Sequence, residues 1–195
     1  MGYRGRKRRL KNFWENAENI MNSFMGGKTT KPVRRSGRWI RKGTEGRRIV
    51  VKGADHLTKT LLKNDMLKER IKDSEKKPEY FTVIHPKGRV FMKKEWGVQE
   101  YFNKPNILQI RLYLELKRNS KTSSRGFTEE EYLMVKQFMN NRVNRGITSE
   151  KIDEAYNELR RWTRDARDDA LLHPHNVLIQ GINRDGKIRL TIIDV

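Results

Sequence analysis

Residues 171–195 read LLHPHNVLIQGINRDGKIRLTIIDV, and this stretch decides the fold. An apolar run at Val177–Ile179 and a second one at Ile188–Ile193 are separated by a segment that contains NRDG. Asp-Gly in such a segment favours the tight connection of a β-hairpin. The stretch therefore predicts two antiparallel strands, with Asn176 just before the first strand and Asp194 just after the second.

The first third of the chain predicts two helices and a short strand. Apolar residues recur at three- and four-residue spacing over Leu10–Met25, as in an amphipathic helix, and Gly26-Gly27 ends it. Ile49–Lys52 is expected to be a strand that ends at Gly53, and His56–Lys72 a polar helix. The buried side of this second helix is predicted to carry Leu57, Leu61, Leu62, Met66, Leu67 and Ile71.

Two β-rich runs follow, Tyr80–Ile84 and Arg89–Lys93, and the residues HPKG join them. Turn residues between apolar runs predict that the two runs form a hairpin. The next apolar run, Ile107–Leu116, fits either a strand or a helix, and its periodicity does not decide between them.

Two helix signals precede the final hairpin. Thr128 and Glu131 have the spacing of a capping box, and the helix that they begin is expected to run to about Asn144. A second helix is expected from about Ser149 to Arg167. The order of helices and short strands predicts an α+β fold built on a small antiparallel sheet.

The charge balance is strongly basic, with 44 Lys and Arg against 24 Asp and Glu and a formal net charge of +20. Such a balance favours a polyanionic partner, most often nucleic acid, although a charge that serves solubility alone is the alternative. Basic residues concentrate in residues 1–11 and 28–48, and the second segment suits either a hairpin or an arm that orders against phosphates. The residues predicted to bind nucleic acid are Arg4, Arg6, Lys7, Arg8, Arg9, Arg34, Arg35, Arg38, Arg41 and Lys42.

Other features exclude several classes of protein. The chain has no cysteine, which excludes disulfides and thiolate metal sites. No apolar run approaches the roughly 20 residues that a membrane-spanning helix needs, and the basic N-terminus lacks the apolar segment of a secretory signal. We therefore expect a cytoplasmic protein without membrane contact, either free or in a nucleoprotein or virus particle.

The end of the chain also carries a resemblance to a known family. His173–Ile179, the turn, and Leu190–Asp194 resemble the catalytic loop and metal-binding hairpin of the protein-kinase-like superfamily. The pattern is closest to the aminoglycoside and choline phosphotransferases, in which a loop H-G-D-L-H-P-x-N-V-L-[IV] precedes a hairpin that ends in I-I-D. The resemblance implies that Asn176 and Asp194 are ligands of a Mg²⁺ ion that accompanies ATP, and oxygen ligands suit that ion.

The resemblance extends to earlier elements through their order along the chain. Lys52, at the end of its strand, resembles the lysine that pairs with nucleotide phosphates. Glu69 on the next helix resembles the partner of that lysine, and Asp65 is a second candidate on the same face. Glu95-Trp96-Gly97 resembles the hinge that passes over the adenine.

This likeness also implies a division of the chain. Residues 1–48 would form a basic N-terminal arm with its amphipathic helix, and residues 49–195 a kinase-like α+β domain. Within that domain, residues 49–100 would be the small lobe and residues 101–195 a partial large lobe. The two-lobed architecture would be truncated after the metal-binding hairpin.

One departure from the family pattern bears on catalysis. The aspartate that accepts the substrate proton should stand five residues before Asn176, where this chain has Leu171. Leucine cannot accept a proton, so Asp169 or Asp168 is the candidate substitute if the loop is shifted. We therefore expect a nucleotide-binding, kinase-like protein in which ATP- and Mg²⁺-dependent phosphotransfer is impaired or lost. The alternative is a non-catalytic, basic protein that binds nucleic acid or assembles with protein partners in a nucleoprotein or virus particle.

Overall fold

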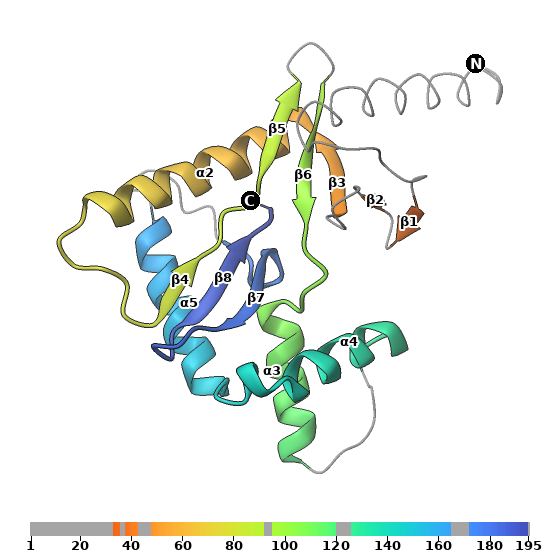
Figure 1. Cartoon of the computed structure of the whole chain (residues 1–195), viewed down its shortest axis with the longest axis vertical. Helices are drawn as coiled ribbons and strands as arrows, with labels where there is room; N and C mark the ends of the chain where they lie inside the picture. The colour runs from red at the N-terminus through yellow and green to blue at the C-terminus, as the bar shows by residue number, and fades with distance from the viewer. Residues whose placement is uncertain are drawn as a thin grey trace.

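The computed structural model describes residues 33–35, 38–42, 48–91, 95–119, 126–164 and 172–194. This part of the chain has an α+β fold, as predicted, with helices packed against two separate small sheets (Figure 1). The helix predicted over residues 10–25 lies outside the described residues. No helix in the described ranges is long and apolar enough to cross a membrane.

The first sheet is antiparallel, with five strands in the order β1-β2-β3-β6-β5. Helix α2 (Ala54–Asp73) follows β3 directly and packs against this sheet beside β5 and β6 (Figure 1). The strand predicted at 49–52 is therefore confirmed, and residues 33–42 contribute two paired strands to the same sheet. The strands are β1 (Val33–Arg35), β2 (Arg38–Lys42), β3 (Arg48–Gly53), β5 (Gly88–Phe91) and β6 (Trp96–Tyr101).

The helix predicted at 56–72 is confirmed as α2, but the face that it buries differs from the predicted face. Leu57 and Leu67 are buried, as expected, whereas Leu62 is 58% exposed and Met66 is 44% exposed. Thr60 and Asn64 occupy the interior positions between the two buried leucines. The prediction assigned interior positions by apolar character alone, and it missed these two because buried polar side chains can form hydrogen bonds within the helix.

The second sheet has three strands in the order β4-β8-β7. β7 (Val177–Ile182) and β8 (Ile188–Ile192) form the antiparallel hairpin predicted from the end of the sequence. β4 (Phe81–Val83) pairs with β8 in parallel. The sheet thus joins two segments that lie far apart in the sequence.

The predicted hairpin of residues 80–93 is wrong. Its two runs form β4 and β5, which belong to different sheets. The backbone leaves β4 with a hydrogen bond from the amide of Ile84 to the carbonyl of Leu190, and β5 pairs instead with β6. Turn residues indicate that the chain changes direction, but they do not determine which strands pair.

The remaining helices surround the second sheet. The ambiguous run at 107–116 is helical, because Asn106 and Gln109 form a capping box at its start. The capping box of Thr128 and Glu131 is confirmed, and its helix ends at Asn140, earlier than expected. The helices are α3 (Ile107–Arg118), α4 (Glu129–Asn140) and α5 (Ser149–Thr163), with short 3₁₀ turns η2 (Arg142–Asn144) and η3 (Pro174–Asn176).

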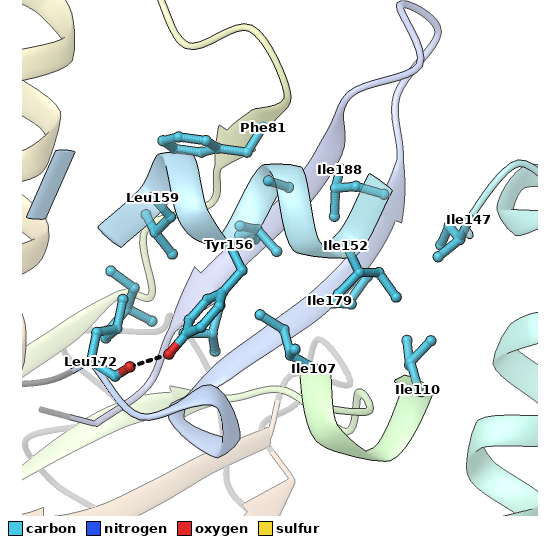
Figure 2. Close-up of a cluster of buried hydrophobic side chains, with 14 of the residues drawn as sticks. Phe81, Ile107, Ile110, Ile147, Ile152, Tyr156, Leu159, Leu172, Ile179 and Ile188 are labelled. Atoms are coloured by element: carbon cyan, nitrogen blue, oxygen red, sulfur yellow. Dashed lines mark hydrogen bonds between the residues drawn. The ribbon is translucent and has the colours of Figure 1, made fainter. Parts of the chain in front are cut away.

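The main hydrophobic core lies between α5, α3 and the second sheet (Figure 2). Ile152 and Leu159 of α5 and Ile179 of β7 are at most 1% exposed. The hydroxyl of Tyr156 donates a hydrogen bond to the carbonyl of Leu172 (Figure 2). Burial raises the pKa of Tyr156, which favours the protonated hydroxyl that donates this hydrogen bond. Helix α5 thereby holds the segment that leads into η3.

A buried carboxylate connects α5 to the start of β4. Glu158 is 8% exposed, and its two carboxylate oxygens accept hydrogen bonds from the amides of Glu79 and Tyr80, at 2.9 and 2.8 Å. The carbonyl of Tyr80 accepts in turn from the amide of Ile188 on β8. These contacts place β4 beside the hairpin and so help to fix the position at which β8 ends.

Candidate functional site

A cleft of about 520 Å³ lies between the two sheets. Its lining comes from segments that are distant in sequence: β3 and β6 of the first sheet, η3 and β7 of the second, and the beginnings of α3 and α4. The residues that line it include Val50, Lys52, Gln99, Phe102, Lys104, Asn176, Leu178 and Ile193.

Lys52 joins the two sheets at one end of this cleft. Its ammonium nitrogen lies 3.5 Å from Oδ1 of Asp194 and also donates a hydrogen bond to the carbonyl of Ile193. The Lys52 side chain is only 9% exposed, whereas that of Asp194 is 30% exposed. A nearly buried cation attracts an anionic ligand more strongly than an exposed one, because water screens its charge less.

Asn176 and Asp194 lie at the same end of the β7–β8 hairpin. Val177 pairs with Ile192, and the carbonyl of Asn176 accepts a hydrogen bond from the amide of Ile193 at 2.9 Å. The structure therefore brings Asn176, Asp194 and Lys52 together, as the resemblance implied, and their roles remain a prediction.

Asp194 and Asn176, near Lys52, carry the type of oxygen atom that a hard cation prefers. Asp194 Oδ1 is buried and has no hydrogen-bond donor, so its contact with Lys52 is an ion pair alone. Asn176 lines the cleft and carries an amide oxygen. No group of three or more His, Cys, Asp or Glu side chains that could hold a metal occurs among the described residues. A Mg²⁺ ion here would need further oxygen ligands from phosphates and water.

The structure corrects the expectation for Glu69. This residue lies on the exposed side of α2, and its carboxylate is 3.5 Å from the ammonium of Lys72. Asp65, the second candidate, is also exposed. Helix α2 instead reaches the end of β8 through Asn64, whose Nδ2 donates to the carbonyl of Ile192 at 3.3 Å. Helical periodicity explains why Glu69 is exposed. The buried positions 57, 60, 64 and 67 lie on one face of α2, and Glu69 does not lie on that face.

The structure also corrects the expectation of a hinge at Glu95-Trp96-Gly97. Trp96 and Gly97 are the first residues of β6 rather than a connection between lobes. The segment that leaves the far end of β6, Phe102–Lys104, lines the cleft and leads into α3. The sequence signal for this connection is the short polar segment NKPN that separates β6 from α3.

Sequence reasoning missed the polar residue at the inner wall of the cleft. Gln99 of β6 is 1% exposed and lines the cleft, and neither atom of its carboxamide has a hydrogen-bond partner. A single glutamine within a strand gives no pattern that separates it from an exposed strand residue. Only the pairing of β6 with β3 shows where its side chain lies.

The other predicted site residues divide into two groups. Asp169 and Leu171 lie outside the described residues, as do Arg4, Arg6, Lys7, Arg8 and Arg9. Arg34 and Arg35 belong to β1, and Arg38, Arg41 and Lys42 belong to β2. Their prediction as nucleic-acid contacts stays open.

No protein-family model matches the chain, and no match was found among curated proteins or solved structures.

Proposed function

We propose that the cleft between the two sheets binds a nucleoside triphosphate together with Mg²⁺, and that the protein is kinase-like with impaired or lost phosphotransfer. The observation that carries this proposal is the meeting of Lys52 and Asp194, at 3.5 Å, beside Asn176. Phosphoryl-transfer proteins hold a triphosphate by a cationic side chain and by a Mg²⁺ ion on oxygen ligands. Lys52 is the candidate cationic side chain, and Asp194 and Asn176 are the candidate oxygen ligands for the metal ion.

At the phosphate end, each side chain has a separate task. Lys52 binds phosphate oxygens, and Asp194 with Asn176 binds the metal ion, which neutralises charge on the phosphates when it is present. A metal ion would also bind Asp194 Oδ1, which is buried, pairs with Lys52 and receives no hydrogen bond. This is the same pairing of Asn and Asp that the kinase-like resemblance implies.

The other part of the cleft suits a flat, apolar base. Val50 of β3 and Leu178 of β7 line it from the two sheets, and they are 4% and 6% exposed. The connection Phe102–Lys104 adds backbone groups that can form hydrogen bonds with a base. The volume of about 520 Å³ lies within the range of roughly 300–1,000 Å³ that small-molecule sites occupy.

Calorimetric titration of the full chain with ATP and Mg²⁺ tests the proposal. We expect saturable binding that requires Lys52 and Asp194. The absence of binding at millimolar nucleotide would overturn it. Incubation with γ-labelled ATP then measures whether any phosphate is released or transferred, and the expected rate is far below that of an active kinase because Leu171 occupies the position of the general base.

A second candidate function rests on the net charge of +20. In this proposal the basic residues of segments 1–11 and 28–48 neutralise phosphates of DNA or RNA, free or within a nucleoprotein or virus particle. Each phosphate contact to B-DNA should add about −0.9 to the slope of log affinity against log salt. Filter binding over a range of salt concentrations measures this slope, and a flat dependence would exclude the proposal. Both functions can coexist, because they use different segments.

A further inference from the structure

Gln99 lies where a base would meet the inner wall of the cleft. In the register of β3 and β6, Gln99 is the partner of Val50, and Gly97 is the partner of Lys52. Directly paired residues of antiparallel strands point to the same face of the sheet. The Gln99 side chain therefore lies next to Val50, and it is two positions along β6 from the partner of Lys52.

The carboxamide of Gln99 lacks hydrogen-bond partners among the described residues. Both Oε1 and Nε2 are buried and form no hydrogen bond. Buried polar groups in folded proteins are nearly always paired, and an unpaired one costs free energy. Since Gln99 faces the cleft, a ligand can supply both a donor and an acceptor.

We propose that Gln99 determines which base the cleft accepts, by pairing its carboxamide with two neighbouring atoms on the edge of the base. This inference rests on the proposed nucleotide-binding function. A carboxamide presents a donor and an acceptor in one plane. Adenine offers its 6-amino group beside N1, and guanine offers its 6-oxo group beside N1–H. A base without the substituent at position 6 leaves one atom of Gln99 buried and unpaired, so it binds less tightly.

The test compares nucleotides that differ at the edge of the base formed by position 6 and N1: purine differs from adenine at position 6 alone, and 2-aminopurine differs from guanine both at position 6 and in having an acceptor in place of N1–H. Calorimetric titration of the wild-type chain first establishes whether ATP or GTP binds more tightly. The preferred nucleotide is then compared with its analogue that lacks the 6-substituent, purine riboside triphosphate for ATP or 2-aminopurine riboside triphosphate for GTP. We expect the wild type to favour the complete base by about tenfold or more.

Two variants test whether Gln99 causes this preference for the complete base. Gln99→Met keeps the length of the side chain and removes the carboxamide, and it should bind both nucleotides with nearly equal affinity. Gln180→Met is the matched control, because Gln180 of β7 also has a buried, unpartnered Nε2 but does not line the cleft. This control should keep the wild-type preference.

Each outcome is decisive. Equal binding of the two nucleotides by the wild type would overturn the role of Gln99, whether or not the variants fold. A Gln99→Met variant that retains the preference would also overturn it and would assign Gln99 to internal packing. If neither ATP nor GTP binds the wild type, the proposed nucleotide site itself fails, which is a separate result.

Discussion

Lys52 of β3 and Asp194, directly after β8, form an ion pair of 3.5 Å that connects the two sheets. The carbonyl of Ile193 accepts a hydrogen bond from the same ammonium, and Asn64 of α2 donates to the carbonyl of Ile192. The first sheet and its helix thus hold three consecutive residues at the end of the hairpin. This relationship builds the phosphate end of the proposed site.

Gly97 should tolerate no side chain, because α2 packs against β6 at this position. A Cβ atom there would lie 2.6 Å from the carbonyl oxygen of Arg89 and would run into Leu57. We expect Gly97→Ala to lower the free energy of unfolding by about 1–3 kcal/mol. Gly53→Ala is the control: its Cβ meets nothing within 4 Å, and the change should stay within about 0.5 kcal/mol. Urea denaturation measures both, and equal effects would contradict the packing described.

Glu158 should contribute to stability through the hydrogen bonds that its carboxylate accepts from two backbone amides. Glu158→Gln keeps the shape but replaces one acceptor oxygen by an NH₂ group, which then faces an amide donor. We expect a loss of about 1–3 kcal/mol in the free energy of unfolding. Glu154→Gln, one turn earlier on α5 and exposed, is the matched control and should cause little change. If both variants unfold at the same urea concentration as the wild type, the carboxylate does not hold β4.

His85 should make stability depend on pH. Burial lowers the pKa of this histidine, the nearby Lys68 lowers it further, and Asp65 opposes them. Between that lowered pKa and about 6.5, the value of an unfolded chain, the unfolded state binds more protons than the folded one. The free energy of unfolding should therefore fall as the pH is lowered through about 6.5. His85→Gln should reduce this fall in denaturation curves recorded at pH 7.5 and 5.5; an unchanged slope would contradict the assignment.

Local signals in the sequence predicted several elements correctly. The Asp-Gly turn between apolar runs defined the β7–β8 hairpin, and the spacing of Thr128 and Glu131 defined the start of α4. Asn176 and Asp194 follow from that hairpin, since residues at its two open ends must lie close together. Each of these features depends on residues that are near one another in the chain.

The larger failures concern contacts between distant segments. Nothing near Phe81–Val83 indicates that β4 pairs with β8 rather than with β5. The interior face of α2 depends on which elements pack against it, so Leu62 and Glu69 could not be placed from helical spacing alone. Gln99 is the clearest case, because its position in the cleft follows only from the pairing of β3 and β6.

The most direct test of the nucleotide site measures thermal unfolding of three proteins with and without ATP and Mg²⁺: the wild type, Asp194→Asn, and Asp185→Asn as an exposed control at the turn of the same hairpin. A ligand at 100 times its dissociation constant stabilises a protein by about 2.7 kcal/mol. We predict that ATP with Mg²⁺ raises the unfolding temperature of the wild type and of Asp185→Asn, and that Asp194→Asn loses this response. An unchanged unfolding temperature of the wild type, or an equal rise in Asp194→Asn, would contradict the account.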